Sequence, residues 1–229
     1  MAPPETSTVS LPEVLPLFPL TGVLLLPGTL LPLHIFEPRY RNLVEDVLKA
    51  DGVFGIIQPV VPRQDNRPLP GAEKENPELY RVGGAGHIES WERLPDGRYA
   101  IQLRGVNRFR SEAELPLHRG YRRVQANYGF FPDAALEKNW CCDRARLIRA
   151  LESYGRAHGL RLQMDEIDRL GDIEIVNLLG VSLPFHPAEK QALLEAPGPK
   201  EREEVLCRLL QLGIEPTDPG SDVPPRTIN

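Results

Sequence analysis

The chain has 229 residues, a net charge of −5, 41% hydrophobic residues and 26% charged residues. This length allows one large domain or two small ones with a real core, and the mild acidity gives no overall attraction to nucleic acid. Five prolines interrupt the apolar stretch between Leu11 and Phe36, which excludes a membrane-spanning helix there. The first basic residue is Arg39, so we expect no secretory signal with a positively charged start.

The cysteines and histidines do not form a recognisable site in the sequence. The three cysteines (Cys141, Cys142 and Cys207) have neither the spacing of a metal site nor that of a disulfide framework. Cys141 and Cys142 are adjacent, and we expect one of them to face the core rather than both to act in redox chemistry. The five histidines are scattered. We therefore expect no metal and no cofactor, in a reduced cytoplasmic protein without a membrane partner.

The first half of the chain predicts a small β-barrel over residues 11–132, after a disordered start at residues 1–10. Short strands are indicated at Val53–Ile57, at residues 99–103 with residues 88–94 as the hairpin partner, and at residues 123–128. Gly83, Gly84 and Gly86 predict a bulge or tight bend where the barrel closes.

One helix is inserted in this β region. An apolar stripe with helical spacing predicts it, formed by Tyr40, Leu43, Val44, Val47 and Leu48. Pro38 suits the first turn of the helix, and the pair Asp51-Gly52 ends it. Residues 59–77 follow as a polar loop with five prolines, which is a candidate for mobility and for contacts.

Residues 133–214 predict a bundle of four short-linked helices. Their apolar stripes are Leu147, Ile148, Leu151 and Tyr154; then Ile167, Leu170, Ile173, Val176 and Leu179; then a short helix from Pro187 to Leu194; and finally Val205, Leu206, Leu209 and Leu210. Residues 129–132 form the expected junction with the barrel, and residues 215–229 a flexible tail.

Three segments of the sequence carry a family resemblance. They read LPLFPLTGVLLLPGTLLPLHIFEPRYR at residues 15–41, GRYAIQLRGVNRFR at residues 97–110 and LLGVSLPFHPAEKQALLE at residues 178–195. In this order they resemble the N-terminal, substrate-handling domain of the ATP-dependent protease Lon. The resemblance implies an α+β fold with a PUA-like β-barrel followed by a helical bundle, in a stand-alone protein of the Lon-domain type. It also implies a recognition module for unfolded or degron-bearing polypeptides or for a protein partner.

The resemblance does not extend to the catalytic machinery of Lon. No lysine in the sequence follows a glycine or precedes a serine or threonine, so a Walker A phosphate-binding loop is absent. We also expect no protease domain with its Ser-Lys pair, for which the 229 residues leave no room. We therefore expect a non-enzymatic binding protein, whose oligomeric state the sequence leaves open.

The apolar surface near the N-terminus is the candidate peptide-binding site, because a barrel crossed by a helix leaves a groove for an extended peptide. The candidate residues are Phe18, Leu20, Phe36, Glu37, Arg39 and Tyr40. The alternative to a binding role is a structural one, in which Phe18, Phe36 and Tyr40 belong to the core. Phe130 and Phe131 at the junction form a second candidate, as the lining of a cleft between barrel and bundle.

Two other functions are open alternatives. Residues 98–123 hold seven arginines and two acids with interleaved aromatics, which favours a nucleic-acid surface through Arg119, Arg122 and Arg123. In the structural alternative these arginines face outward from barrel strands, and Arg104 and Arg108 hold loops in place. An enzyme of unrecognised type would instead need converging titratable groups, such as His34 with Glu37 or His87 with Glu89.

Overall fold

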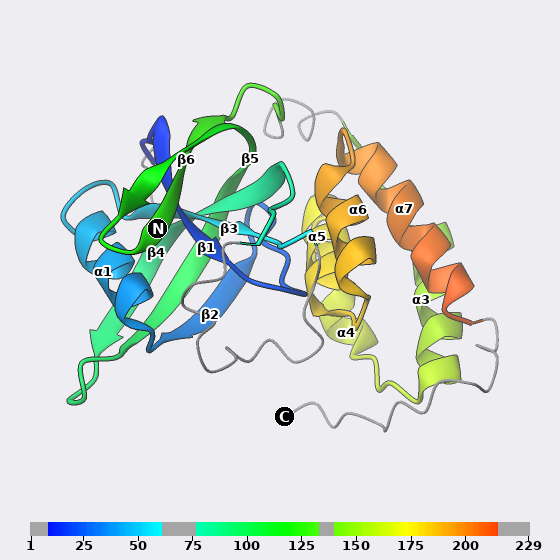
Figure 1. Ribbon diagram of the computed structural model, residues 1–229. Helices are drawn as coiled ribbons and strands as arrows, with labels where there is room; N and C mark the ends of the chain where they lie inside the picture. Colours follow the sequence, from blue (N-terminus) through cyan, green and yellow to red (C-terminus); the bar gives the residue numbers. More distant parts are fainter. Residues whose placement is uncertain (1–8, 61–76, 133–139, 215–229) are drawn as a thin grey trace, which may run out of the picture.

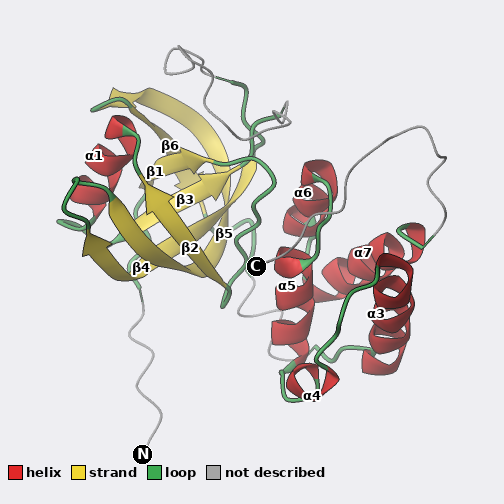
Figure 2. Ribbon diagram, turned by 90° about the horizontal axis from the view of Figure 1, so that it is seen from below, coloured by secondary structure: helices red, strands yellow, loops and turns green. Residues whose placement is uncertain are grey.

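The computed structural model describes residues 9–60, 77–132 and 140–214. The strands are β1 (Val14–Pro19), β2 (Leu30–Ile35), β3 (Val53–Ile57), β4 (Val82–Arg93), β5 (Tyr99–His118) and β6 (Tyr121–Asn127). The helices are α1 (Pro38–Val47), α3 (Arg144–His158), α4 (Met164–Ile167), α5 (Asp172–Ser182), α6 (Pro187–Glu195) and α7 (Pro199–Leu212). Strands and α1 form one side of the molecule, and α3 to α7 form the other (Figures 1 and 2). The α+β class expected from the sequence is confirmed.

The six strands form one mixed sheet in the order β2-β5-β4-β3-β1-β6. Only the β1–β3 pair is parallel among these ladders. The long strand β5 pairs with β2 and β4 in its first half and with β6 in its second half. Because β6 also pairs with β1, the ladders run from β5 through β4, β3, β1 and β6 back to β5. The predicted irregularity among the glycines is confirmed by a register shift between Ala85 and Gly86.

Two of the glycines are required by close packing rather than by a turn. The chain that connects β1 to β2 passes directly over the sheet, and a Cβ atom at Gly84 would collide with the carbonyl oxygen of Leu25. Gly105 has the same relationship to the carbonyl oxygen of Leu26. The absence of a Cβ atom at Gly84 and Gly105 allows the backbone of residues 24–26 to pack directly on β4 and β5. Leu24 and Leu26 then reach the apolar cluster of the helices.

The apolar residues gather in three clusters. Helix α1 covers one end of the sheet, where its stripe of Tyr40, Leu43, Val44 and Val47 packs with Phe54, Ile101 and Tyr121. A second cluster lies inside the sheet and includes Leu15, Leu17 and Phe109. The third cluster joins α3, α5, α6 and α7 and includes Leu24 and Leu26 from the β1–β2 connection. The sheet side and the helical side therefore share a core.

Buried polar side chains also connect the two sides. The Nδ2 atom of Asn177 on α5 donates to the carbonyl oxygen of Pro27 at 3.0 Å, and Arg202 on α7 donates to the Oδ1 atom of Asn177 at 2.8 Å. Gln58, after β3, donates to the Oε1 atom of Gln191 on α6 at 3.1 Å. Such contacts need their partners in place, because an unpaired polar group is costly in the interior. They hold α5, α6 and α7 against the sheet.

The elements differ most from the prediction at two places. The stripe at residues 167–179 is not one helix but two, α4 and α5, which are separated at Gly171. The backbone N–H of Gly171 donates to Glu174 at 2.7 Å, and Arg144 donates to the carbonyl oxygen of Leu170 at 3.0 Å, so this corner is fixed by hydrogen bonds. Strand β5 also extends to His118, far beyond the expected residues 99–103.

Several expectations lie outside the described residues. These are the disordered start, except for its last two residues, the flexible tail and most of the polar loop at residues 59–77. The division into subdomains at residues 11–132 and 133–214 stays a prediction.

Candidate functional site

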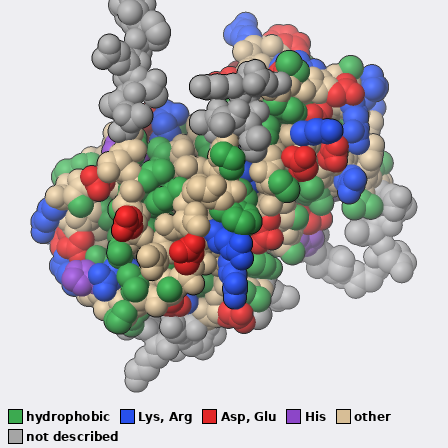
Figure 3. All heavy atoms as spheres, turned by 90° about the horizontal axis from the view of Figure 1, so that it is seen from above, with side chains coloured by type: hydrophobic (Ala, Val, Ile, Leu, Met, Phe, Trp, Pro, Cys, Tyr) green, Lys and Arg blue, Asp and Glu red, His purple; other side chains and the backbone are tan. Residues whose placement is uncertain are grey.

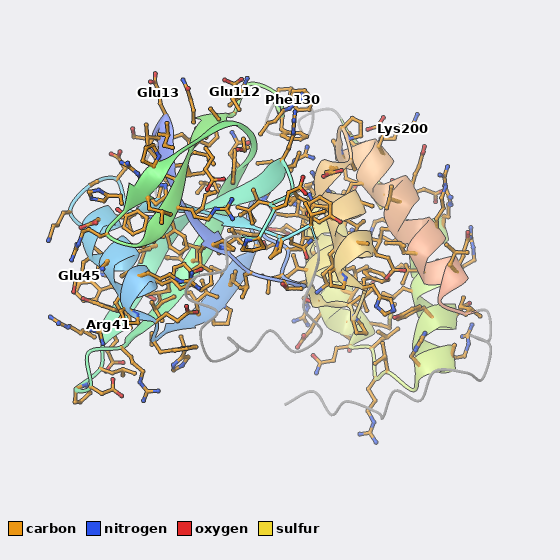
Figure 4. The ribbon with its side chains drawn as sticks, in the orientation of Figure 1. Glu13, Arg41, Glu45, Glu112, Phe130 and Lys200 are labelled. Carbon is orange, nitrogen blue, oxygen red and sulfur yellow. The ribbon has the colours of Figure 1, made fainter. Side chains whose placement is uncertain are left out.

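A pocket of about 570 Å³ lies where the sheet, the junction after β6 and the end of α6 meet. It is lined by Val60, Glu78, Leu79, Tyr80, Arg81, Val82, Arg110, Phe130, Phe131 and Glu195. The segment before β4 and the second half of β5 contribute one wall, because Val82 pairs with Arg110 in the ladder. Phe130 lies at the top of the molecule, at the boundary between sheet and helices (Figure 4). This pocket is the cleft that the sequence predicted as a second candidate.

The two phenylalanines of the junction have different roles in the pocket. Phe131 is buried, and the guanidinium of Arg108 lies 4.0 Å from its ring centroid. Phe130 is 53% exposed, and the guanidinium of Arg110 lies 4.7 Å from its ring centroid. The two rings meet edge to face with centroids 4.9 Å apart. Phe131 therefore forms a fixed base, and Phe130 offers an open aromatic face at the rim.

Charges of both signs surround this aromatic face. Glu78, Arg81 and Glu195 line the pocket and are exposed, and Arg110 is half-buried beside them. Neither Arg81 nor Arg110 forms an ion pair within the described residues. On this face of the molecule, acidic, basic and hydrophobic side chains are interspersed, without a large area of one sign (Figure 3). The pocket therefore suits a partly apolar ligand better than a strongly charged one.

The candidate residues near the N-terminus are divided between core and surface. Phe18 and Tyr40 are 9% and 6% exposed, and their ring centroids lie 4.1 Å apart inside the α1 cluster. Leu20 is half-buried against the same cluster, whereas Phe36 is 53% exposed. Burial raises the pKa of Tyr40 to about 12. A ligand can reach Phe36 directly, but Phe18 and Tyr40 hold α1 in place.

Glu37 and Arg39 lie beside this surface and pair with each other. The Nη2 atom of Arg39 lies 2.8 Å from the Oε2 atom of Glu37, and the guanidinium of Arg39 lies 4.6 Å from the ring centroid of Tyr40. The pair is half-buried, so its charges are already partly satisfied within the protein. Contact of Phe36, Glu37 and Arg39 with a peptide stays a prediction.

The arginines of the nucleic-acid alternative all have protein partners. Arg119 forms ion pairs with Glu45 at 3.1 Å and with Asp46, both on α1. Arg122 forms an ion pair with Glu114 and donates to the carbonyl oxygen of Pro77 at 2.6 Å. The Nη2 atom of Arg123 donates to the carbonyl oxygen of Pro116 at 3.1 Å. The charges of Arg119 and Arg122 are thereby paired with acids, which weakens their attraction for an RNA phosphate, whereas the bond of Arg123 is to a neutral carbonyl group.

The acids proposed for an enzyme are engaged in the same way. Glu37 pairs with Arg39, as described, and Glu89 pairs with Arg104 at 2.7 Å. Within the described residues, His34 and His87 form no hydrogen bond to either acid, whose partners are Arg39 and Arg104. In the same ranges, no group of three or more metal-ligating side chains exists. Burial raises the pKa of Cys142 to about 12, and its neighbour Cys141 is exposed.

Comparison with known proteins gives one family. The family model described as "ATP-dependent protease La (LON) substrate-binding domain" matches residues 14–211. The chain belongs to this family. The chain resembles Lon protease 2 of Myxococcus xanthus with 31% identity over 219 residues, which are 92% of the chain and 25% of that protein. It resembles the Lon protease of Cytophaga hutchinsonii with 28% identity, over 92% of the chain and 26% of that protein.

The chain thus spans about a quarter of the length of these two proteases. Two solved structures have the same fold. A Lon N-terminal domain protein from Xanthomonas campestris matches with a TM-score of 0.58 and 24% identity, over 86% of this chain and 97% of that one. The N-terminal domain of the Mycobacterium avium complex Lon protease matches with a TM-score of 0.60 and 18% identity, over 87% and 98%. The resemblance deduced from the three sequence segments is confirmed.

The residues around the pocket were only partly accessible from the sequence. The doublet of Phe130 and Phe131 was a usable signal, because two adjacent aromatics at a junction cannot both be buried easily. Arg110 and Glu195 gave no signal, since they belong to elements far apart in the chain and meet only in the fold.

The described residues contain no helix long and apolar enough to cross a membrane.

Proposed function

We propose that this domain is a non-catalytic module that binds unfolded or degron-bearing protein segments at the cleft around Phe130. The membership in the Lon substrate-binding family supports the class of ligand. The observation that carries the proposal is the half-exposed ring of Phe130 over a pocket of about 570 Å³. Unfolded polypeptides differ from folded ones by their exposed apolar side chains, and this pocket is suited to take one such side chain.

The pocket stabilises a bound apolar side chain without a large rearrangement. Phe131 and Val82 are buried and keep their positions when the ligand arrives. Arg110 stacks on Phe130 and restricts its rotation, so little side-chain entropy is lost on binding. Burial of one Leu or Phe side chain contributes about 1.5–3 kcal/mol. Affinity for a single segment is therefore modest, and a client with several apolar residues binds better than a client with one.

We also infer that the closed circuit of ladders is the PUA-like barrel and that α3 to α7 are the bundle expected from the sequence. The proposal that the domain lacks ATPase and peptidase activity is supported by the absence of a Walker A sequence and by the region of Lon that it matches. A cytoplasmic location fits the same proposal. Nucleic acid receives less support as the ligand, because Arg119, Arg122 and Arg123 already have protein partners.

The test is binding of a fluorescein-labelled peptide of about twelve residues with Leu and Phe at alternate positions and Ser and Lys between them. Fluorescence anisotropy should show binding, and Phe130→Ala should weaken it roughly tenfold. Trp91→Ala is the matched control, because Trp91 is an aromatic residue with 52% exposure that lies nine positions beyond Val82 on β4. The affinity of Trp91→Ala for the peptide should stay within about twofold of the affinity of the original protein.

The proposal is contradicted if Phe130→Ala and Trp91→Ala lose the same amount of affinity for the peptide, or if the original protein does not bind the peptide. A labelled single-stranded RNA serves as the second probe. Binding of RNA that disappears at high salt and requires Arg119 and Arg122 would favour the nucleic-acid function instead.

A further inference from the structure

Strand β2 has an open edge within the part of the chain that the structure describes. Among the described residues it pairs only with β5, which places it at the end of the strand order. No isolated bridge and no backbone hydrogen bond from outside its ladder reaches residues 30–35 in those ranges. An open edge carries backbone N–H and C=O groups that another extended chain can pair with.

The register shows which groups face outward. Gly105 on β5 donates its N–H to the carbonyl oxygen of Thr29 at 2.9 Å, just before β2 begins. In an antiparallel ladder, hydrogen-bonded pairs alternate with non-bonded pairs. The bonded pairs are therefore Leu31, Leu33 and Ile35 with their partners on β5, and the backbone groups of Leu30, Pro32 and His34 face away from β5.

Proline at position 32 agrees with this assignment. Proline has no N–H to donate, and in a sheet it occupies edge positions where that group would face solvent. The open edge therefore offers two donors, from Leu30 and His34, and three acceptors, from Leu30, Pro32 and His34. Because the proline interrupts the donors, the edge supports a short pairing rather than a long continuous ladder.

The side chains of β2 alternate in the same way. Leu30, Pro32 and His34 are exposed, whereas Leu31 and Leu33 are half-buried against the α1 cluster. The strand has no acidic side chain and no lysine or arginine. At its end, Phe36 adds a 53% exposed ring. An occupant of this edge would thus meet an apolar strip with backbone hydrogen-bonding groups and little charge.

We propose that the outer edge of β2 binds an extended, uncharged polypeptide segment as an added strand, with apolar side chains at alternate positions covering Leu31 and Leu33. This inference rests on the proposed function, since the ligand is again an unfolded polypeptide. It adds a second binding surface, which recognises the backbone of the ligand and not only one side chain. A segment that has lost its own hydrogen-bond partners by unfolding meets this requirement, and a folded protein does not.

The first test uses the alternating peptide described above with Ser in place of each Lys, and a version of this uncharged peptide with N-methyl groups on alternate backbone nitrogens. The two peptides have the same side chains, but the second cannot donate hydrogen bonds along one edge. We prepare both registers of N-methylation, and one of them should weaken binding roughly tenfold, as expected for the loss of two or three backbone hydrogen bonds. Equal affinity of all three peptides overturns the inference and leaves the proposed function intact.

The second test changes the protein at one backbone donor. His34→Pro removes an outward N–H while leaving the ladder to β5, and His34→Ala removes the imidazole but keeps the N–H. Binding should fall several-fold in His34→Pro and stay unchanged in His34→Ala, with equal melting temperatures showing that both variants fold. If His34→Pro does not fold, hydrogen exchange of the original protein decides, because the peptide should slow exchange at Leu30 and His34.

Unchanged exchange at both amides in the presence of saturating peptide overturns the inference. A dimer that dissociates in His34→Pro would assign the edge to a second copy of the chain and would overturn it as well. If no peptide binds at all, the proposed function fails together with this inference. If Phe130→Ala weakens binding but His34→Pro does not, the cleft is the binding site and the inference about the β2 edge is overturned.

Discussion

The buried guanidinium of Arg108 on β5 donates a hydrogen bond of 2.7 Å to the carbonyl oxygen of Leu194 at the end of α6. The same Nη1 atom donates to the carbonyl oxygen of Ala196 at 2.5 Å, and Nη2 donates to that of Pro197 at 3.3 Å. The turn between α6 and α7 is thereby attached to the sheet directly beneath the cleft. Arg108 also stacks on Phe131, so one side chain positions both walls of the pocket.

Replacement of Arg108 should therefore destabilise the fold and not only the cleft. Arg108→Ala leaves the carbonyl oxygens of Leu194 and Ala196 buried without donors, and we expect a loss of about 3–5 kcal/mol in the free energy of unfolding. Urea denaturation measures this loss. Arg98→Ala is the control, because Arg98 is exposed and its ion pair is with an exposed neighbour in the chain, Asp96. A change below about 1 kcal/mol in the free energy of unfolding of Arg108→Ala would show that the hydrogen bonds of Arg108 to the turn between α6 and α7 are not needed for stability.

Alkaline pH should weaken the attachment of α1. Burial raises the pKa of Tyr40 to about 12, and the nearby guanidinium of Arg39 opposes this only in part. The phenol of the unfolded chain ionises near pH 10, whereas the folded protein keeps it neutral. The stabilisation by the neutral phenol is therefore complete below pH 10 and is lost as the pH rises from there toward 12.

Tyr40→Phe removes this ionisation. Its melting temperature should fall less than that of the original protein between about pH 9 and about pH 11.5. Part of the fall should remain, since burial also raises the pKa of Tyr121 and Tyr128. Parallel curves for the two proteins would mean that Tyr40 ionises in the folded state as easily as in the unfolded one.

The elements with local signals could be predicted from the sequence. Helix α1 begins at Pro38 and buries the predicted stripe, because proline at the first turn and a regular apolar spacing are both local features. The break between α4 and α5 was missed, since the apolar spacing continues through Gly171 while Arg144, from α3, fixes the corner. That contact depends on tertiary structure and leaves no trace in the spacing.

The candidate site shows the same limit. Phe36 and Phe130 stand out in the sequence as large apolar residues, but only the fold shows that Phe18 and Tyr40 are buried. The open edge of β2 was also invisible, because edge position depends on the order of strands in the sheet. Pro32 was the one local indication, and in the sequence it was indistinguishable from the other prolines of the N-terminal stretch.

The most direct test of the central claim is photo-crosslinking of the alternating peptide with a benzophenone side chain in place of one Phe, followed by mass spectrometry of the adducts. If the cleft binds unfolded segments, the adducts should map to its lining, at Tyr80, Val82 or Phe130, and unlabelled peptide should compete for them. Adducts that map only to other surfaces, or that unlabelled peptide fails to reduce, would contradict the assignment of the cleft as the recognition site.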